Sequence, residues 1–238
     1  MPDPVFQGLS NVYTDGGSSS GTTATVTFPT IVAGELVVVW VQRDDYATIT
    51  GVTLGTQDMS ELKRVDSDSG APNQFQGGLW GCIADSGGTS VVATATWSSS
   101  DNWRSMAGGR WNNVASATPL TSACNSSTCV GRSGASTDRT FQSITTGVRA
   151  LIMTWATDWD FYSTHTASSG YTKRLDNAIA GGGSSTTIFS LDKVVDAGTY
   201  GGTEVVSTAT SDQWFGAILA FEPAAASRKP SMTLLGAG

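Results

Sequence analysis

The sequence predicts an all-β protein, a jelly-roll-like β-sandwich built from two internally duplicated halves. Short apolar or alternating runs are separated by clusters of glycine, serine, asparagine and aspartate, which is the pattern of strands joined by turns. Charged residues make up only 14% of the chain, against about 25% in typical domains, and stretches rich in glutamate and lysine are lacking. A ten-residue segment also occurs twice, which indicates the duplication.

The repeated segment reads GGTSVVATAT at residues 87–96 and GGTEVVSTAT at residues 201–210. Further landmarks occur in the same order in both parts of the chain. The matched pairs are Phe28 with Phe141, Ile31 with Ile144, Trp40 with Trp155, Lys63 with Lys173, Asp66 with Asp176, and Trp103 with Trp214. Because the matches keep their order and spacing, we interpret residues 21–115 and 134–223 as two copies of one unit.

Each copy contains the same series of predicted strands. The apolar run at residues 36–41 predicts a strand buried on both faces, and alternating runs predict strands with one exposed face. The expected strands are 23–28, 36–41, 61–65, 75–83, 90–97 and 103–111 in the first half, and 139–141, 150–156, 172–175, 187–195, 204–210 and 213–221 in the second.

The domain organisation follows from the two copies. We expect an N-terminal arm at residues 1–20, the duplicated sandwich at residues 21–223 and a C-terminal arm at residues 224–238. Six short strands per half make a thin core, and the joining segment 112–138 lacks the composition of a linker. These features favour halves that interleave into a single sandwich with pseudo-twofold symmetry, and two tandem sandwiches are the alternative.

Net charge and apolar runs exclude two classes of partner. The formal net charge is −7, and no basic patch of the kind that binds nucleic acid occurs. The longest apolar run, residues 36–41, is far shorter than the roughly 18 residues of a membrane span, so membrane insertion is not expected. The N-terminus lacks the basic and apolar regions of a signal peptide, which predicts synthesis in a cytoplasm.

The three cysteines differ in their surroundings. Cys82 lies in an apolar run and reads as a small core residue. Cys124 and Cys129 flank a short polar segment, where they could form a disulfide or stay as two reduced thiols, depending on the compartment.

His165 is the only histidine, which excludes a metal site made of several histidines. As a general base it would need a nucleophile and an orienting acid placed by the fold. It lies in a polar stretch, so we expect a solvated loop histidine. No cofactor and no enzymatic activity are expected.

Two acidic and aromatic loops follow equivalent strands of the two halves. Their residues are Asp44, Asp45 and Tyr46 in the first half, and Asp158, Trp159, Asp160 and Tyr162 in the second. The favoured interpretation is that aspartates cap turns while aromatic rings pack at the rim. The alternatives are contact with a glycan or receptor, a calcium site, and paired carboxylates for glycoside cleavage.

Seven of the eight tryptophans fall into two groups by their place in the repeat, and the eighth, Trp159, lies in the second acidic and aromatic loop. Those that recur at matched positions are expected to fill equivalent places in the core: Trp40, Trp155, Trp103 and Trp214. Trp80, Trp97 and Trp111 lack an obvious counterpart and could lie at an edge or an interface.

The C-terminal arm lies outside the duplication. Its basic and apolar residues suggest an arm that pairs with a neighbouring subunit, namely Arg228, Lys229, Met232, Leu234 and Leu235. A loose chain end is the alternative.

The order of motifs resembles a family of duplicated β-sandwich modules found in bacteriophage structural proteins and in some bacterial surface proteins. The order is Phe-x-x-Ile-x-x-Gly, an apolar strand with Trp, Lys-Arg-x-Asp, Gly-Gly-Thr-x-Val-Val, then Ser-Asp-x-Trp, and it covers about residues 21–223. Arg110 to Val114 resembles the point where the first unit ends.

The resemblance implies a virion structural protein at the particle surface, most simply a decoration or cement protein, with capsid or tail proteins and copies of itself as partners. A tail-fibre or minor tail protein, and an adhesion module that binds a host surface glycan or receptor, are the alternatives.

Overall fold

The protein is built entirely from strands in the part that the structure describes. The computed structural model describes residues 1–14, 21–44, 48–66, 75–101, 104–124, 136–158, 165–168, 170–181, 184–201, 205–212 and 214–225. These residues form nineteen strands and no helix, which confirms the all-β prediction. Within the same ranges, no helix is long and apolar enough to span a membrane.

One antiparallel sheet, which we call the first central sheet, gathers most of the first half. Its order is β1-β10-β4-β8-β7, and β2 also pairs with β10. The bounds are β1 Val5–Leu9, β2 Tyr13–Thr14, β4 Leu36–Asp44, β7 Ser60–Asp66, β8 Phe75–Ile83 and β10 Arg104–Asn112.

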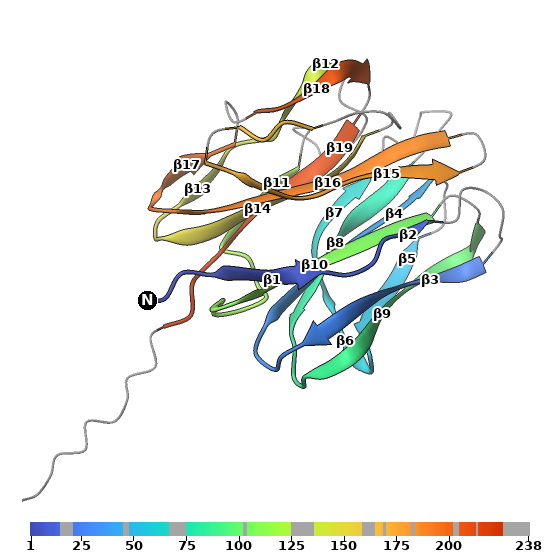
Figure 1. Cartoon of the computed structure of the whole chain (residues 1–238), viewed down its shortest axis with the longest axis horizontal. Coiled ribbons are helices and arrows are strands. Elements are labelled where there is room, and N and C mark those ends of the chain that lie inside the picture. The colour runs from blue at the N-terminus through green and yellow to red at the C-terminus, as the bar shows by residue number, and fades with distance from the viewer. Residues whose placement is uncertain are drawn as a thin grey trace, which may run out of the picture.

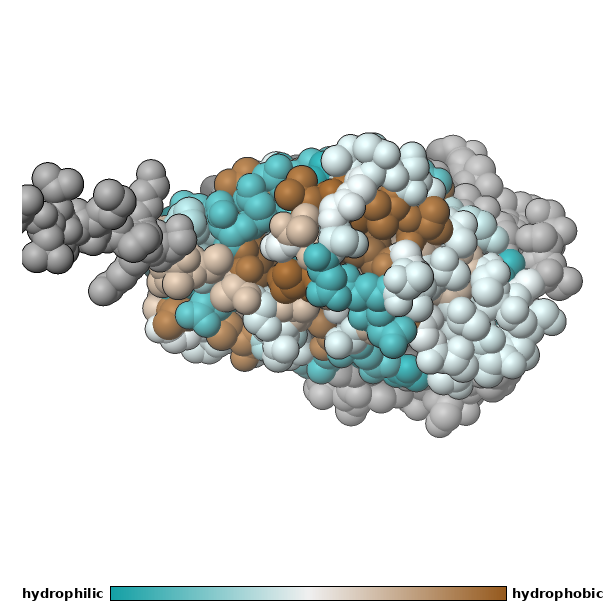
Figure 2. All heavy atoms as spheres, turned by 90° about the horizontal axis from the view of Figure 1, so that it is seen from below, coloured by the Kyte–Doolittle hydropathy of each residue, from teal (hydrophilic) through white to brown (hydrophobic). Residues whose placement is uncertain are grey.

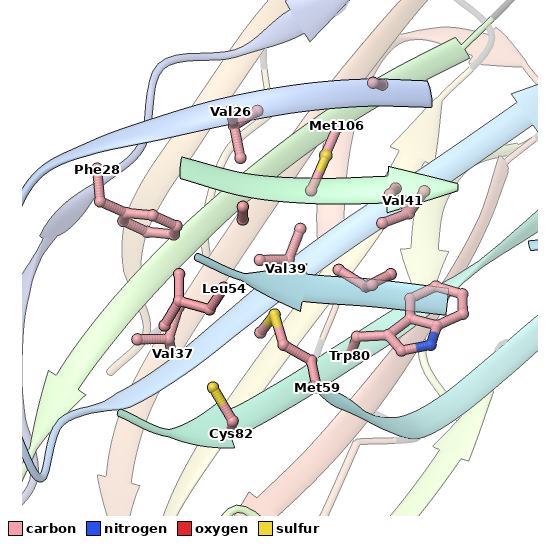
Figure 3. Close-up of a cluster of buried hydrophobic side chains, with 14 of the residues drawn as sticks. Val26, Phe28, Val37, Val39, Val41, Leu54, Met59, Trp80, Cys82 and Met106 are labelled. Atoms are coloured by element: carbon pink, nitrogen blue, oxygen red, sulfur yellow. The ribbon is translucent and has the colours of Figure 1, made fainter. Parts of the chain in front are cut away.

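A second sheet of the first half, the first outer sheet, covers one face of the first central sheet. Its order is β3-β9-β5-β6, with bounds β3 Gly21–Ile31, β5 Ile49–Leu54, β6 Gln57–Asp58 and β9 Gly88–Asp101. Figure 3 shows side chains from both sheets meeting in the core between them, among them Phe28 of β3, Val39 of β4 and Trp80 of β8. Cys82 is buried in this core, as predicted.

The second half repeats this arrangement with a smaller outer layer. The second central sheet has the order β11-β19-β14-β16-β15, and two short ladders, β12-β18 and β13-β17, form the second outer layer. Phe141 and Ile144 pack from this layer onto Ile152, Leu191 and other apolar residues of the sheet. The bounds are β11 Thr121–Cys124, β12 Ser136–Thr140, β13 Ile144–Thr146, β14 Ala150–Asp158, β15 Thr172–Gly181, β16 Ser184–Val195, β17 Gly198–Tyr200, β18 Val205–Asp212 and β19 Trp214–Phe221.

The two central sheets pack face to face, so the molecule has four layers. Figure 1 shows them in order, with the first outer sheet at the bottom and the second outer layer at the top. The core between the central sheets contains Trp40 of β4, Trp155 of β14 and Phe215 of β19. A strand in a central sheet therefore needs apolar side chains on both faces. This explains why every side chain of β14 is buried, and why the run 36–41 is apolar throughout.

The two central sheets have equivalent strand orders. By their place in the repeat, β4, β7, β8 and β10 correspond to β14, β15, β16 and β19. The order β10-β4-β8-β7 in one sheet thus matches β19-β14-β16-β15 in the other. An additional edge strand completes each sheet next to β10 or β19, namely β1 from the N-terminal arm and β11 from the segment that joins the halves.

The strand ladders differ from those of a single interleaved sandwich. Each ladder joins strands of one half, or a strand of one half to β1, β2 or β11. Between the halves, the described residues form one isolated bridge, Val114 with Pro223, and otherwise side-chain contacts. The physical reason lies in the central strands: because they are apolar on both faces, each half can cover one face with its own outer strands and the other face with its partner half.

The N-terminal arm is part of the first central sheet in its described residues. β1 pairs with β10 from Val5 to Leu9, and the backbone N–H of Asn11 donates to the carbonyl of Thr27 while its side chain accepts from the Thr27 N–H. These contacts occupy the free edge of β3, and Pro29 removes a further donor from it.

All twelve predicted strands are present, eleven of them within four residues of the expected bounds, whereas the strand predicted at residues 172–175 extends to Gly181. The sequence did not reveal β1, β2, β5, β6, β11, β13 and β17, which are short or lie outside the repeat landmarks. Trp40, Trp155 and Trp214 are buried as predicted, while Trp103 lies outside the described residues. Trp80 and Trp97 are buried in the core of the first half and do not lie at an edge, and Trp111 is buried between the two central sheets.

The surface matches the low content of charged residues. On the first outer sheet, Thr25 pairs with Thr94, which also pairs with Thr53, and all three positions face away from the core. On the face seen in Figure 2, hydrophobic side chains lie among neutral and hydrophilic ones.

Candidate functional site

The predicted contact residues lie at the ends of two equivalent strands. Asp44 ends β4, and Asp158 ends β14. Of Asp44 only the backbone is described, and the other loop residues, Asp45, Tyr46, Trp159, Asp160 and Tyr162, lie outside the described residues. The same holds for Cys129 and for the C-terminal arm residues Arg228, Lys229, Met232, Leu234 and Leu235, whereas Cys124 is described only as the last backbone position of β11.

Asp158 is fully buried and does not face solvent. Its Oδ2 lies 3.2 Å from Nε2 of His165. The alternation of β14 places Asp158 on the same face as Ile152 and Ala156, beneath the second outer layer. Its carboxylate is therefore part of an internal cluster.

The expectation of a solvated His165 is wrong, because its side chain is buried. Nδ1 lies 2.8 Å from Asp176 Oδ1, and the His165 backbone N–H donates to Asp176 Oδ2 over 3.1 Å. The ring stacks on Phe189, with 4.0 Å between the ring centres. Two carboxylates and an aromatic face thus surround the imidazole. These partners offset the free-energy cost of burying the polar ring, and the polar sequence around His165 did not indicate them.

Lys173 completes the cluster from the rim. Its Nζ donates to the carbonyl of His165 over 2.8 Å and lies 2.6 Å from Asp176 Oδ2. In a regular strand, residues three apart point to opposite faces. A bulge between Lys173 and Leu175 shifts the register of β15 against β16 and brings Lys173 and Asp176 to the same side.

The protonation properties of the cluster follow from this geometry. Burial lowers the pKa of His165, but the hydrogen bonds and charges of Asp158 and Asp176 outweigh it, so the pKa is raised above the ordinary 6.5. Burial alone would raise the pKa of Asp176, yet the hydrogen bonds from His165 and Lys173 hold it below the ordinary 3.8. The charged forms of both groups are therefore favoured.

The sequence did not predict the cluster of Asp158, His165, Lys173 and Asp176, because no sequence pattern links these residues to one another. Lys173 and Asp176 belong to the recurring Lys-Arg-x-Asp motif, which is one landmark of the predicted duplication but indicates no partner for the aspartate. His165 has no counterpart in the first half, where β5 covers the equivalent place with Ile49, Val52 and Leu54. A single histidine beside an acidic strand end was the only available signal.

A second buried polar group joins the two central sheets near the ends of β4 and β14. Trp40 Nε1 donates to Thr157 Oγ1 over 2.9 Å, and Thr157 Oγ1 donates to Gln42 Oε1 over 2.6 Å. Ser105 also donates to Gln42 Oε1, over 3.0 Å. The group links β4 and β10 of the first half to β14 of the second.

A third buried polar group is centred on Asp192 and forms a second link between the two central sheets. Trp111 Nε1 donates to Asp192 Oδ2 over 2.7 Å, and Arg174 Nε donates to Asp192 Oδ1 over 2.8 Å. The Arg174 guanidinium also lies over the ring of Phe6, 4.5 Å from its centre. Burial raises the pKa of Asp192 above the ordinary value, and the two donors offset this effect only in part.

A small pocket lies between the second central sheet and its outer layer. It is mainly apolar, and its lining residues are Phe141, Thr154, Ser168, Tyr171, Leu191, Gly201 and Ile218. The Thr154 hydroxyl is buried and has no hydrogen-bond partner among the described residues. Within those residues, no group of three or more His, Cys, Asp or Glu side chains is arranged to hold a metal ion.

Comparison with known proteins adds no relative. No family model, no curated protein and no solved structure matches the chain.

Proposed function

We propose that the protein is a non-enzymatic structural protein of a bacteriophage particle, most simply a decoration or cement protein displayed on the particle surface. The proposal that it is not an enzyme is supported by the structural role of its buried polar side chains. His165, Asp158 and Asp176 join strands to their outer cover, and Asp192 joins the two central sheets. With both ring nitrogens engaged by carboxylates in a buried site, His165 has no nitrogen left for a substrate proton.

The finer fold assignment is a duplicated, jelly-roll-like sandwich. The equivalent strand orders of the two central sheets support the duplication. The chain of the first half crosses repeatedly between its two sheets, since β3 is outer, β4 central, β5 and β6 outer, β7 and β8 central, β9 outer and β10 central. These crossings support the jelly-roll-like description. Two such units packed back to back make a rigid block suited to a structural role.

The virion setting is supported by the resemblance of the repeated motifs to phage sandwich modules and by the threonine-rich, weakly charged surface. Its partners would be capsid or tail proteins and further copies of itself. Tail placement would use the same scaffold. The burial of Asp158 weakens the alternative of a glycan-binding loop, because a carboxylate clasped by His165 cannot bind a sugar hydroxyl.

The test is to look for the protein in particles. Virions released from the strain whose genome carries the gene should contain it as a stoichiometric component by mass spectrometry. Purified protein should also bind particles from which the gene has been deleted, and cryo-electron microscopy should show added density at the surface. Protein that neither occurs in particles nor binds them would refute the proposal. Saturable glycan binding that is lost in Trp159→Ala would favour an adhesion module instead.

A further inference from the structure

We propose that Asp158, His165 and Asp176 form a protonation-dependent clasp that holds residues 165–168 on the second central sheet while His165 carries two ring protons, and that releases them when one is lost. The inference concerns the conformation of the chain, and it goes beyond the proposed function because it holds whichever partner the protein binds.

The donors and acceptors around the His165 ring determine which protonation state fits. Each ring nitrogen of His165 lies within hydrogen-bond distance of a carboxylate oxygen, 2.8 Å for Nδ1 and 3.2 Å for Nε2. An ionised carboxylate can only accept, so both nitrogens must donate, and only the imidazolium has two N–H groups. With both carboxylates ionised, the geometry therefore requires a second proton on the ring.

The charges around the His165 ring balance only when the ring is protonated. Among the described residues, the groups that face it are Asp158 from β14, Asp176 and Lys173 from β15, and the uncharged ring of Phe189 from β16. With a protonated His165, two positive charges balance two negative ones. Loss of the proton leaves a net negative charge and sets a nitrogen lone pair against a carboxylate in a buried site, which is strongly unfavourable.

The clasp holds a short segment, residues 165–168, against the second central sheet. Residues 165–168 contact the sheet through the His165 ring, its backbone N–H on Asp176 and its carbonyl on Lys173. Ser168 also lines the pocket beneath this cover. In the first half the equivalent cover is apolar in its described residues, with Ile49 and Val52 in the core, and those residues place no histidine–aspartate cluster there. The switch therefore acts on one half only.

The direction of the pH effect follows from the raised pKa of His165. A group whose pKa is higher in the folded state stabilises that state fully below its unfolded value, and this stabilisation is lost as the pH rises through the folded value. The clasp is thus closed at pH 6 and opens on the alkaline side. For each unit by which the pKa of His165 in the folded protein exceeds 6.5, deprotonation lowers the equilibrium constant for closing the clasp about tenfold.

Nuclear magnetic resonance can test the clasp directly, because the protein contains one histidine. Selective ¹⁵N labelling of histidine should show both ring nitrogens protonated at pH 6, and a titration should give a pKa above 6.5. Amide hydrogen exchange, expressed as protection factors to remove the intrinsic pH dependence, should show loss of protection at residues 165–176 over the same pH range. Protection at residues 48–58 of the first half should stay constant.

The variant Asp158→Asn should abolish the alkaline transition. An asparagine amide can donate to Nε2 while Nδ1–H donates to Asp176, so a neutral ring is fully paired and the pKa of His165 falls. Asp196→Asn is the matched control, because it removes one carboxylate, from an exposed pair with Arg149, and should leave the titration unchanged.

Three results would overturn the proposal. They are a His165 pKa at or below 6.5, a singly protonated ring at pH 6, and protection at residues 165–176 that stays constant through the titration. If Asp158→Asn does not fold, the titration and exchange of the unaltered protein decide the question alone.

Discussion

Trp111 Nε1 donates a 2.7 Å hydrogen bond to Asp192 Oδ2 across the boundary between the two central sheets. Trp111 belongs to β10 of the first half and Asp192 to β16 of the second, and neither residue is more than 3% exposed. Because Trp111 lacks a counterpart in the repeat, this contact distinguishes one side of the packed pair of sheets from the other. The two halves are thus held by specific polar contacts as well as by apolar packing.

The first prediction concerns this contact. Trp111→Phe should destabilise the protein more than Trp155→Phe, by roughly 1.5–3 kcal/mol, because it leaves a buried carboxylate oxygen without its donor. Trp155 is the matched control, since it lies in the same core but its Nε1 has no partner among the described residues. Urea unfolding of both variants measures the difference. Equal losses would mean that the hydrogen bond adds nothing to stability.

Replacement of two threonines on β14 by valine should change the free energy of unfolding by different amounts. Thr157→Val removes the acceptor of the Trp40 indole and the donor to Gln42, so it should cost about 2 kcal/mol of unfolding free energy. Thr154→Val keeps the shape and removes a buried hydroxyl that has no partner among the described residues, so it should be neutral or stabilising, within about 1 kcal/mol. Thermal unfolding by calorimetry distinguishes the two outcomes. A large loss for Thr154→Val would show that its hydroxyl has an important partner.

Gly216 permits the close approach of β19 to β14. A Cβ atom there would lie 2.6 Å from the Trp155 carbonyl oxygen and would also meet the Ala156 side chain. Gly216→Ala should therefore destabilise the protein by about 3 kcal/mol, since neither contact belongs to a flexible side-chain end. At Gly51 a Cβ atom meets nothing within 4 Å, so Gly51→Ala is the control and should leave the unfolding midpoint nearly unchanged. Similar midpoints for both variants would contradict the packing described here.

The free energy of unfolding at acidic pH should depend on Asp176. Its folded pKa lies below 3.8, so its contribution is present above that value and is lost as the pH falls through the folded pKa. Asp176→Asn should cost about 3 kcal/mol at pH 7, because His165 and Lys173 lose their shared carboxylate. The gap between the variant and the unaltered protein should narrow as the pH is lowered below 3.8. A gap that stays constant with pH in urea titrations would assign the loss to shape rather than charge.

Strand identity was predictable because local pattern controls it. The apolar run of β4 and the alternation of β3 and β9 required no knowledge of their neighbours, and similar landmarks in the second half predicted strands there too. The cluster around His165 was not predictable in this way. A bulge in β15 decides which side Asp176 faces, and a bulge changes the two-residue period without a clear sequence signal.

The sequence by itself determined the all-β class, the positions of the principal strands and the two-part pattern, because side-chain period and turn residues act over a few positions. Only the tertiary structure decided that the central sheets pack against each other, that β1 and β11 complete them, and that His165 is buried between two aspartates. The reason is that burial of a polar residue depends on partners from distant strands, and their approach depends on how all four layers pack.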